Sequence, residues 1–294
     1  MSDEKKFAVL LKPREQQPAL DRAVQYARVN SNISIVAVRV INEFDDAEIN
    51  DITVREQSAF DSIKRSYSVN NLSLKLVFNR DVADGFLKEC ASGGYDLAII
   101  SANKRNTIKD LFVSSIDSSI MRQTTIPLLV VKEAAGVNVV GSSVVVAIDF
   151  SDSSETKKYH DYLFMAASKF ASSFDGDVHI ANCVTPTSSG YSSRNLRESK
   201  FVSGGLAEPF EINNQIAEEF AKEHNLTVEN VHVLRGRVDE EIPRLCHQLN
   251  ARMVCMLTTP RSTFLGSVNS SASELVLDQI HGDVFIVNAE TIKE

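Results

Sequence analysis

The sequence predicts an α/β protein of two domains, each built on a mostly parallel sheet. Apolar strand patterns alternate with amphipathic helix patterns along the chain, which is the order of βαβ units. Residues 133–143 are small and polar, and the same order starts again after them. The 294 residues suffice for two domains that each bury a core. We therefore predict domains at 1–136 and 142–294.

Five strand patterns and four helix patterns mark the first half. The first helix begins at Pro18, a residue that suits the first helical turn, and later helix patterns surround Phe60, Phe86 and Ile120. Residues 72–78 alternate apolar and polar side chains, whereas residues 97–100 are apolar throughout. The expected strands are 7–11, 33–41, 72–78, 97–100 and 127–131.

The second half repeats this plan. Strands are expected at 144–148, 178–182, 231–234, 253–257 and 284–287, with helix patterns around 162–170, Ile216, Ile242 and Val276. A shift of 156 residues superposes 96–132 on 252–288 without a gap, because 252 minus 96 is 156. Apolar classes then agree along both strands, and Ser114 and Ser115 meet Ser270 and Ser271. The register indicates an internal repeat.

Composition excludes several classes of partner. A net charge of −8 disfavours nucleic acid and anionic membrane surfaces, both of which attract clustered Lys and Arg. No apolar run approaches the ~20 residues that span a bilayer, and the polar residues 1–6 lack the apolar core of a signal peptide. The four cysteines form no CxxC pair, and three of them sit in apolar patterns typical of buried thiols. We expect a cytoplasmic protein without membrane insertion.

One segment does not repeat. Residues 183–213 contain Gly190, Gly204 and Gly205 among many serines, and they are long for a connection in a compact domain. Two interpretations stand for this segment, a binding loop or lid and a disordered insertion.

The element order, the doubling and three phrases together resemble the tandem universal stress proteins, especially those of the E type. The phrases are residues 17–24 (QPALDRAV), 92–97 (SGGYDL) and 240–245 (EEIPRL), and the resemblance covers nearly the whole chain. It implies two Rossmann-like (adenine nucleotide alpha hydrolase-like) domains, each a five-stranded parallel sheet with helices on both faces. It also implies intramolecular domain pairing through the last strands, from Leu128 to Val131 and from Val284 to Val287. Such pairing would cover two apolar sheet edges.

The resemblance also implies a place for a nucleotide. Nucleotide-binding members of the family carry an Asp after the first strand and a Gly-x2-Gly-x9-Gly-(Ser/Thr) motif after the fourth. Glycines let backbone N–H groups approach phosphates, and the next helix adds its positive N-terminus. The motif spacing is kept here without its glycines, as Ser101, Lys104, Ser114 and Ser115 in the first half and Leu257, Pro260, Ser270 and Ser271 in the second. The acid is Lys12 in the first half and Asp149 in the second.

These positions define the candidate cofactor-binding residues, with no catalytic residue and no metal ligand among them. Two alternatives stand for the serines of the motif, which either offer hydroxyls to a phosphate or cap helices: Ser114, Ser115, Ser270 and Ser271. Ser271 with Glu274 forms a capping box, which favours helix capping. The second-half candidates are Asp149, Phe150, Ser151, Leu257, Arg261, Ser270 and Ser271. The weaker first-half candidates are Lys12, Ser101, Lys104, Ser114 and Ser115.

Three functions compete at this point. The first is a non-catalytic stress-response protein with degenerate nucleotide-binding motifs that binds an unknown small ligand or protein partner, with no cofactor expected. The second is an ATP-binding stress switch that uses the second domain and its Asp149. The third is an ATP hydrolase like the PP-loop enzymes, suggested by Gly93 and Gly94 but disfavoured because these glycines follow a helix pattern and suit its C-terminus.

Overall fold

The computed structural model describes residues 4–13, 17–67, 69–102, 115–132, 142–150, 157–184, 209–258, 276 and 279–288. Contacts divide the chain into two compact units. Unit 1 is Met1–Asn138 with Thr258–Asn269 and His281–Glu294, and unit 2 is Val139–Leu257 with Ser270–Ile280. Our predicted domains assign residues 281–294 to the second domain, whereas these residues belong to the first compact unit. No helix in the described ranges is long and apolar enough to cross a membrane.

The sheet of unit 1 contains six strands among the described residues, in the order β3-β2-β1-β4-β5-β10. The first five are parallel, as expected, and β10 is antiparallel to β5. β4 and β5 are buried along their whole length, which explains their uninterrupted apolar sequences. The strands are β1 (Lys5–Leu10), β2 (Ile33–Ile41), β3 (Leu72–Phe78), β4 (Leu97–Ser101), β5 (Leu128–Val131) and β10 (Asp283–Asn288).

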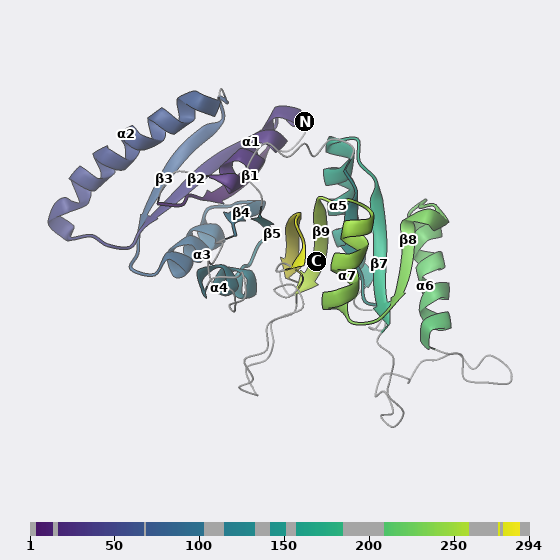
Figure 1. Ribbon diagram of the computed structural model, residues 1–294. Helices are drawn as coiled ribbons and strands as arrows, with labels where there is room; N and C mark the ends of the chain where they lie inside the picture. The colour runs from purple at the N-terminus through teal and green to yellow at the C-terminus, as the bar shows by residue number, and fades with distance from the viewer. Residues whose placement is uncertain are drawn as a thin grey trace, which may run out of the picture. The chain divides into compact units, whose positions relative to one another are not determined.

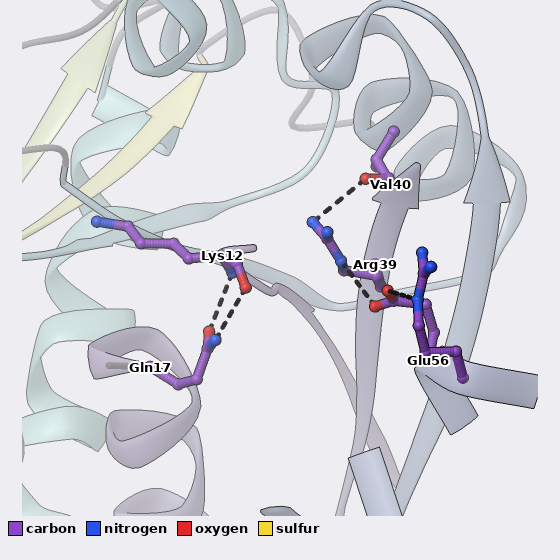
Figure 2. Close-up of polar contacts among 6 residues, drawn as sticks. Lys12, Gln17, Arg39, Val40 and Glu56 are labelled. Carbon is purple, nitrogen blue, oxygen red and sulfur yellow. Dashed lines mark hydrogen bonds and ion pairs between the residues drawn. The ribbon is translucent and has the colours of Figure 1, made fainter. Parts of the chain in front are cut away.

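Helices cover both faces of this sheet. Right-handed crossovers put α1 and α2 on one face and α3 and α4 on the other. Figure 1 shows α2 above the strands and α3 with α4 below them. The helices are α1 (Pro18–Val29), α2 (Ile49–Tyr67), α3 (Val82–Ser92) and α4 (Ser115–Gln123), with a short 3-10 helix η1 (Asp46–Glu48) before α2. Asp81 caps α3 by accepting a bond from the Asp84 N–H at 2.9 Å, and Arg39 of β2 pairs with Glu56 of α2 at 3.1 Å (Figure 2).

β10 is held in unit 1 by its backbone and by a buried ion pair. Its register sets Val284 opposite Val130 and Ile286 opposite Leu128. The Arg22 guanidinium of α1 lies 2.7 Å from the Asp283 carboxylate, with the two side chains 4% and 3% exposed. The Lys132 N–H donates to the other Asp283 oxygen at 3.3 Å. Helix α1, β5 and β10 are therefore joined by one carboxylate.

Unit 2 contains four parallel strands in the order β9-β6-β7-β8. The fifth strand of our expected second sheet is β10, which the division by contacts assigns to unit 1. The strands are β6 (Val144–Ala147), β7 (Val178–Val184), β8 (Val231–Arg235) and β9 (Met253–Thr258). The helices are α5 (Lys157–Ser173), α6 (Pro209–Glu223) and α7 (Val238–Gln248), with a 3-10 helix η4 (Val228–Asn230) before β8.

The strand and helix patterns predicted from the sequence are confirmed wherever the structure describes them. Strands β2 and β3 have the predicted bounds, and every other predicted strand differs by at most two residues at an end. Most of the predicted linker 133–143 lies outside the described residues. The predicted 183–213 loop is shorter, because β7 continues to Val184 and α6 begins at Pro209. Residues 185–208 lie outside the described residues.

Aromatic side chains join α5 to α6 in unit 2. The rings of Phe164 and Phe220 are 5.9 Å apart between centroids, and Phe150, after β6, lies 5.8 Å from Phe220. The His224 ring sits 4.4 Å from Phe164 and 4.2 Å from Phe220, and its Nε2 lies 2.9 Å from Asp161. This cluster places α5 and α6 on the same side of the sheet.

Two histidines pair across β7 and β8. The Nδ1 of His179 and the Nε2 of His232 are 3.1 Å apart, so one nitrogen donates and the other accepts. Burial lowers the pKa of both imidazoles, and the neighbouring His179 lowers the pKa of His232 further. The Asp177 carboxylate raises the pKa of His179 but does not reverse the effect of burial. Both rings are therefore neutral near pH 7.

The buried ion pair yields a test of unit 1. Asp283→Ala leaves the Arg22 charge buried without its partner, so we expect a loss of about 3–5 kcal/mol in the free energy of unfolding. Equilibrium urea unfolding of the full chain, followed by circular dichroism, measures it. Lys88→Ala removes an exposed ion pair with Asp84 and should change little. Arg22→Met with Asp283→Leu should retain most of the stability. Equal effects of Asp283→Ala and Lys88→Ala would refute a structural role for the pair.

The histidine pair predicts a stability that depends on pH. Each imidazole has a folded pKa below its ordinary value of 6.5, so the unfolded chain binds protons more readily. The stabilisation is present above pH 6.5 and is lost as pH falls through the lowered folded pKa values. We expect the fall in Tm between about pH 7.5 and 5.5 to be smaller in His179→Gln with His232→Gln than in wild type. His247→Gln, which changes an exposed histidine, should keep the full fall. An unchanged fall in the double variant contradicts the prediction.

Candidate functional site

The strand order of each unit reverses direction at one point, where a ligand would be expected, and we call this edge of the sheet the crevice of that unit. In open parallel sheets, ligands bind beyond the carboxyl ends of the strands where the order reverses direction. That point lies between β1 and β4 in unit 1 and between β6 and β9 in unit 2. Lys12 and Ser101 lie at the first point, and Asp149, Phe150 and Leu257 lie at the second. The structure therefore brings the described candidates to the expected edges.

Lys12 closes the first crevice from the side of β1. Its ammonium group donates to the carbonyl of Ala102 at 3.1 Å, which links the ends of β1 and β4. Gln17 locks the Lys12 backbone, because its side-chain oxygen accepts from the Lys12 N–H and its amide donates to the Lys12 carbonyl, both at 3.0 Å (Figure 2). A cation held by the chain's own carbonyl thus occupies the place of the family's acid.

Ser101 closes the same crevice from the side of β4. The side chain is buried, with the residue 4% exposed, and its hydroxyl oxygen accepts from the Ala19 N–H at 2.9 Å. That N–H belongs to the first turn of α1, where backbone donors have no partner within the helix. The Ala19 N–H, which would otherwise be available to a ligand, is therefore bonded to Ser101 of the same chain. Ser115 begins α4, while Lys104 and Ser114 lie outside the described residues.

The second crevice carries an exposed acid where the first carries a bonded lysine. Asp149 follows β6 and is exposed, whereas the next residue, Phe150, is buried. The centroid of the Phe150 ring lies 6.4 Å from that of His160 and 5.8 Å from that of Phe220. Phe150 therefore anchors the turn that carries the acid. Leu257 is half-buried near the end of β9. Ser151, Arg261, Ser270 and Ser271 lie outside the described residues.

The sequence did not single out two polar side chains of unit 2, Asn182 and Glu241. The Asn182 amide donates to the Ile148 carbonyl at 2.9 Å, beside the end of β6. Its Oδ1 accepts no hydrogen bond in the part of the chain that the structure describes, although Asn182 is only 1% exposed. The signal for Asn182 was an amide in a mostly apolar strand pattern, 178–184, whose other polar residue is His179.

Glu241 brings a second carboxylate to this edge of the sheet. It is buried in the first turn of α7 and pairs with Arg244. Gly236, with φ of +153°, makes room for it, because a Cβ there would lie 2.7 Å from the Glu241 Cγ. Burial first, and then the charges of Glu241 and Asp149, raise the pKa of the Cys183 thiol to about 12. The charges of both carboxylates therefore act on the Cys183 side chain at this edge.

Other candidate chemistry is weak in the described parts of the chain. Burial raises the pKa of Cys90 and of Cys246 to about 12, so these thiols are poor nucleophiles at neutral pH. No group of three or more His, Cys, Asp or Glu side chains gathers as a metal site among the described residues. Gly93 caps α3 and Gly94 adopts a φ of +65°, which confirms that these glycines end a helix.

Comparison with known proteins agrees with this architecture. The sequence profile of the Universal stress protein family matches residues 5–132 and again 142–288. Universal stress protein E from Escherichia coli strain K12 is 20% identical over 297 aligned positions, which cover 94% of this chain and 91% of that protein. The Photorhabdus laumondii protein of the same name is 18% identical and covers 99% and 96%.

Solved structures show the same fold. A universal stress protein from Archaeoglobus fulgidus DSM 4304 superposes with a TM-score of 0.69 at 15% identity, covering 97% of both chains. A Pseudomonas aeruginosa UCBPP-PA14 protein, provisionally described as a universal stress protein, gives a TM-score of 0.72 at 19% identity, covering 97% and 93%. With two matched segments that together span most of the sequence, this chain belongs to the universal stress protein family as a tandem member.

Proposed function

We propose that this tandem universal stress protein acts in the stress response without catalysis, by binding a small ligand or a protein partner. The observation that carries the proposal is the closed first crevice, where Lys12 and Ser101 bond to Ala102 and Ala19 of the same chain. A site for catalysis or for tight nucleotide binding needs polar groups that are free to meet the ligand. Here the chain itself uses those groups.

The second half carries whatever ligand recognition the protein has. Asp149 is exposed at the end of β6 and rests on the buried Phe150. An exposed carboxylate suits a ribose hydroxyl, an amine or a protein cation. The adjacent negative charge of Glu241 opposes phosphates, and Leu257 stands where nucleotide-binding relatives keep a glycine. An ATP switch in this half is the second candidate function, and the exposure of Asp149 is the observation that favours it.

We also propose that the protein is cytoplasmic and that its two repeats are joined to each other. All four cysteines are unpaired thiols, as expected in a reducing compartment. Strand β10, which comes from the second matched segment, pairs with β5 of the first, and this supports our proposal that the repeats are held together through their last strands.

Calorimetry with Mg·ATP separates the two candidate functions. For the full wild-type chain we expect a Kd weaker than about 100 μM, a binding free energy weaker than about −5.5 kcal/mol. No phosphate or pyrophosphate should be released on prolonged incubation. A sub-micromolar Kd that Asp149→Asn weakens by about tenfold or more, while Lys12→Met leaves it unchanged, would replace our proposal with the ATP switch.

Closure of the first crevice has its own test in Lys12→Met. This change keeps most of the aliphatic volume and removes the bond to the Ala102 carbonyl, so we expect a loss of about 1 kcal/mol in the free energy of unfolding. Urea unfolding measures the loss, and Lys88→Met, at an exposed position of α3, is the matched control. ATP affinity should not rise. A variant as stable as the control would show that the bond from Lys12 to Ala102 does not stabilise this edge. A variant that gains ATP binding would show that Lys12 alone blocks a competent nucleotide site, which would contradict our proposal.

A further inference from the structure

The histidine pair of unit 2 lies outside both crevices, and neither the fold nor the proposed function accounts for it. His179 is on β7 and His232 is on β8, the last strand in the order β9-β6-β7-β8. Ala181 is the register partner of His232. Since side chains alternate along a strand, His179 and Ala181 share a face, and so His179 and His232 meet diagonally on that face.

Their spacing suits a metal ion. A tetrahedral zinc ion with Zn–N bonds of about 2.0–2.1 Å holds two ligand nitrogens about 3.3–3.4 Å apart. The His179 Nδ1 and the His232 Nε2 are 3.1 Å apart, and the ring centroids are separated by 5.3 Å with planes tilted by 34°. A shift of a few tenths of an ångström would open the pair to the separation that a chelated ion requires.

The neutral state of both imidazole rings also suits them to bind a metal ion. Metal ions bind neutral imidazole, and burial keeps the pKa of both rings below the ordinary value. In the resting pair one N–H points at the facing nitrogen. Binding needs only that this proton move to the far nitrogen of its own ring, which leaves His179 protonated at Nε2 and His232 at Nδ1. No net proton is released above the pKa values of the pair.

We propose that the His179 Nδ1 and the His232 Nε2 form a bidentate site for a divalent transition-metal ion such as Zn²⁺. Imidazole nitrogen is a ligand that suits Zn²⁺, Ni²⁺ and Cu²⁺, whereas Mg²⁺ prefers oxygen. Because no third protein ligand gathers there among the described residues, water completes the coordination. Asp177 lies two residues before His179, just before β7, and its charge acts on that ring, which favours a cation.

The site would tie an edge strand to its neighbour. β8 has one described strand partner, β7, and the proposed ion adds a bond between the two strands through side chains. A ligand that binds only the folded state stabilises it by mass action, so occupancy of the site should be visible as thermal stability. The readout therefore needs no enzymatic activity.

Zinc titration of the metal-free full chain tests the proposal. At about pH 7.5, calorimetry should show one Zn²⁺ per chain, and Tm should rise with zinc but not with Mg²⁺. His179→Gln and His232→Gln should each weaken zinc binding by about tenfold or more, the size of loss typical for removing groups around a metal. His247→Gln changes an exposed histidine of α7, and Cys183→Ser changes a thiol four residues from His179. Both controls should bind zinc as wild type does.

The remaining outcomes decide against the site. Wild type that binds no zinc at micromolar concentrations would overturn the proposal, as would an equal loss in His247→Gln or a loss confined to Cys183→Ser. Circular dichroism of each variant shows whether it folds. If a glutamine variant does not fold, His232→Phe keeps an aromatic ring without the nitrogen, and zinc binding as in wild type would then refute the site. Protons compete for the same nitrogens, so affinity should fall at about pH 5.5.

Discussion

The structure of the first unit depends on how the β5 edge of its sheet is covered. An exposed edge of apolar residues such as Leu128–Val131 would present unpaired backbone groups and a sticky surface. Strand β10 pairs with that edge in antiparallel register, and Asp283 at its start meets Arg22 of α1 and the Lys132 N–H. Ion pairs buried to this degree stabilise weakly but are costly to break. The pair therefore favours the register in which β10 covers the β5 edge.

This arrangement means that sequence repeats and compact units differ. The family profile divides the chain after residue 132 and assigns residues 142–288 to a second copy. By contacts, the last strand of that copy belongs to the first unit. Removing the second repeat would thus also remove the strand that covers β5 and the partner of Arg22. The first repeat depends on residues more than 250 positions away from its α1 helix, since 283 minus 22 is 261.

Local patterns in the sequence were sufficient for the elements and for the edges where the candidate residues lie. Strand and helix periods depend on neighbouring residues, so β2 and β3 were predicted to the residue. The local pattern of Val284 to Val287 does not identify a partner for β10, because many sheet edges can accept a short apolar strand, and the expectation of pairing with Leu128 to Val131 came from the family resemblance alone. The closeness of His179 and His232 depends on the register of two strands 53 residues apart. Asn182 and Glu241 became site residues only through the fold, which brings strand β7 and helix α7 to the same edge of the sheet.

The contrast between Lys12 and Asp149 limits what the two halves can do together. Equivalent positions carry opposite charges, and the cation is bonded to the chain's own carbonyl whereas the acid is exposed. The Lys12 ammonium donates to the Ala102 carbonyl at the first crevice, whereas Asp149 and Glu241 place two carboxylates at the corresponding edge of unit 2. The two crevices therefore differ in the sign of their charge, so we do not expect one ligand to bind both in the same way. This contrast supports our proposal that ligand binding is confined to the second half, where an exposed carboxylate such as Asp149 suits ligands with hydroxyl or amine donors.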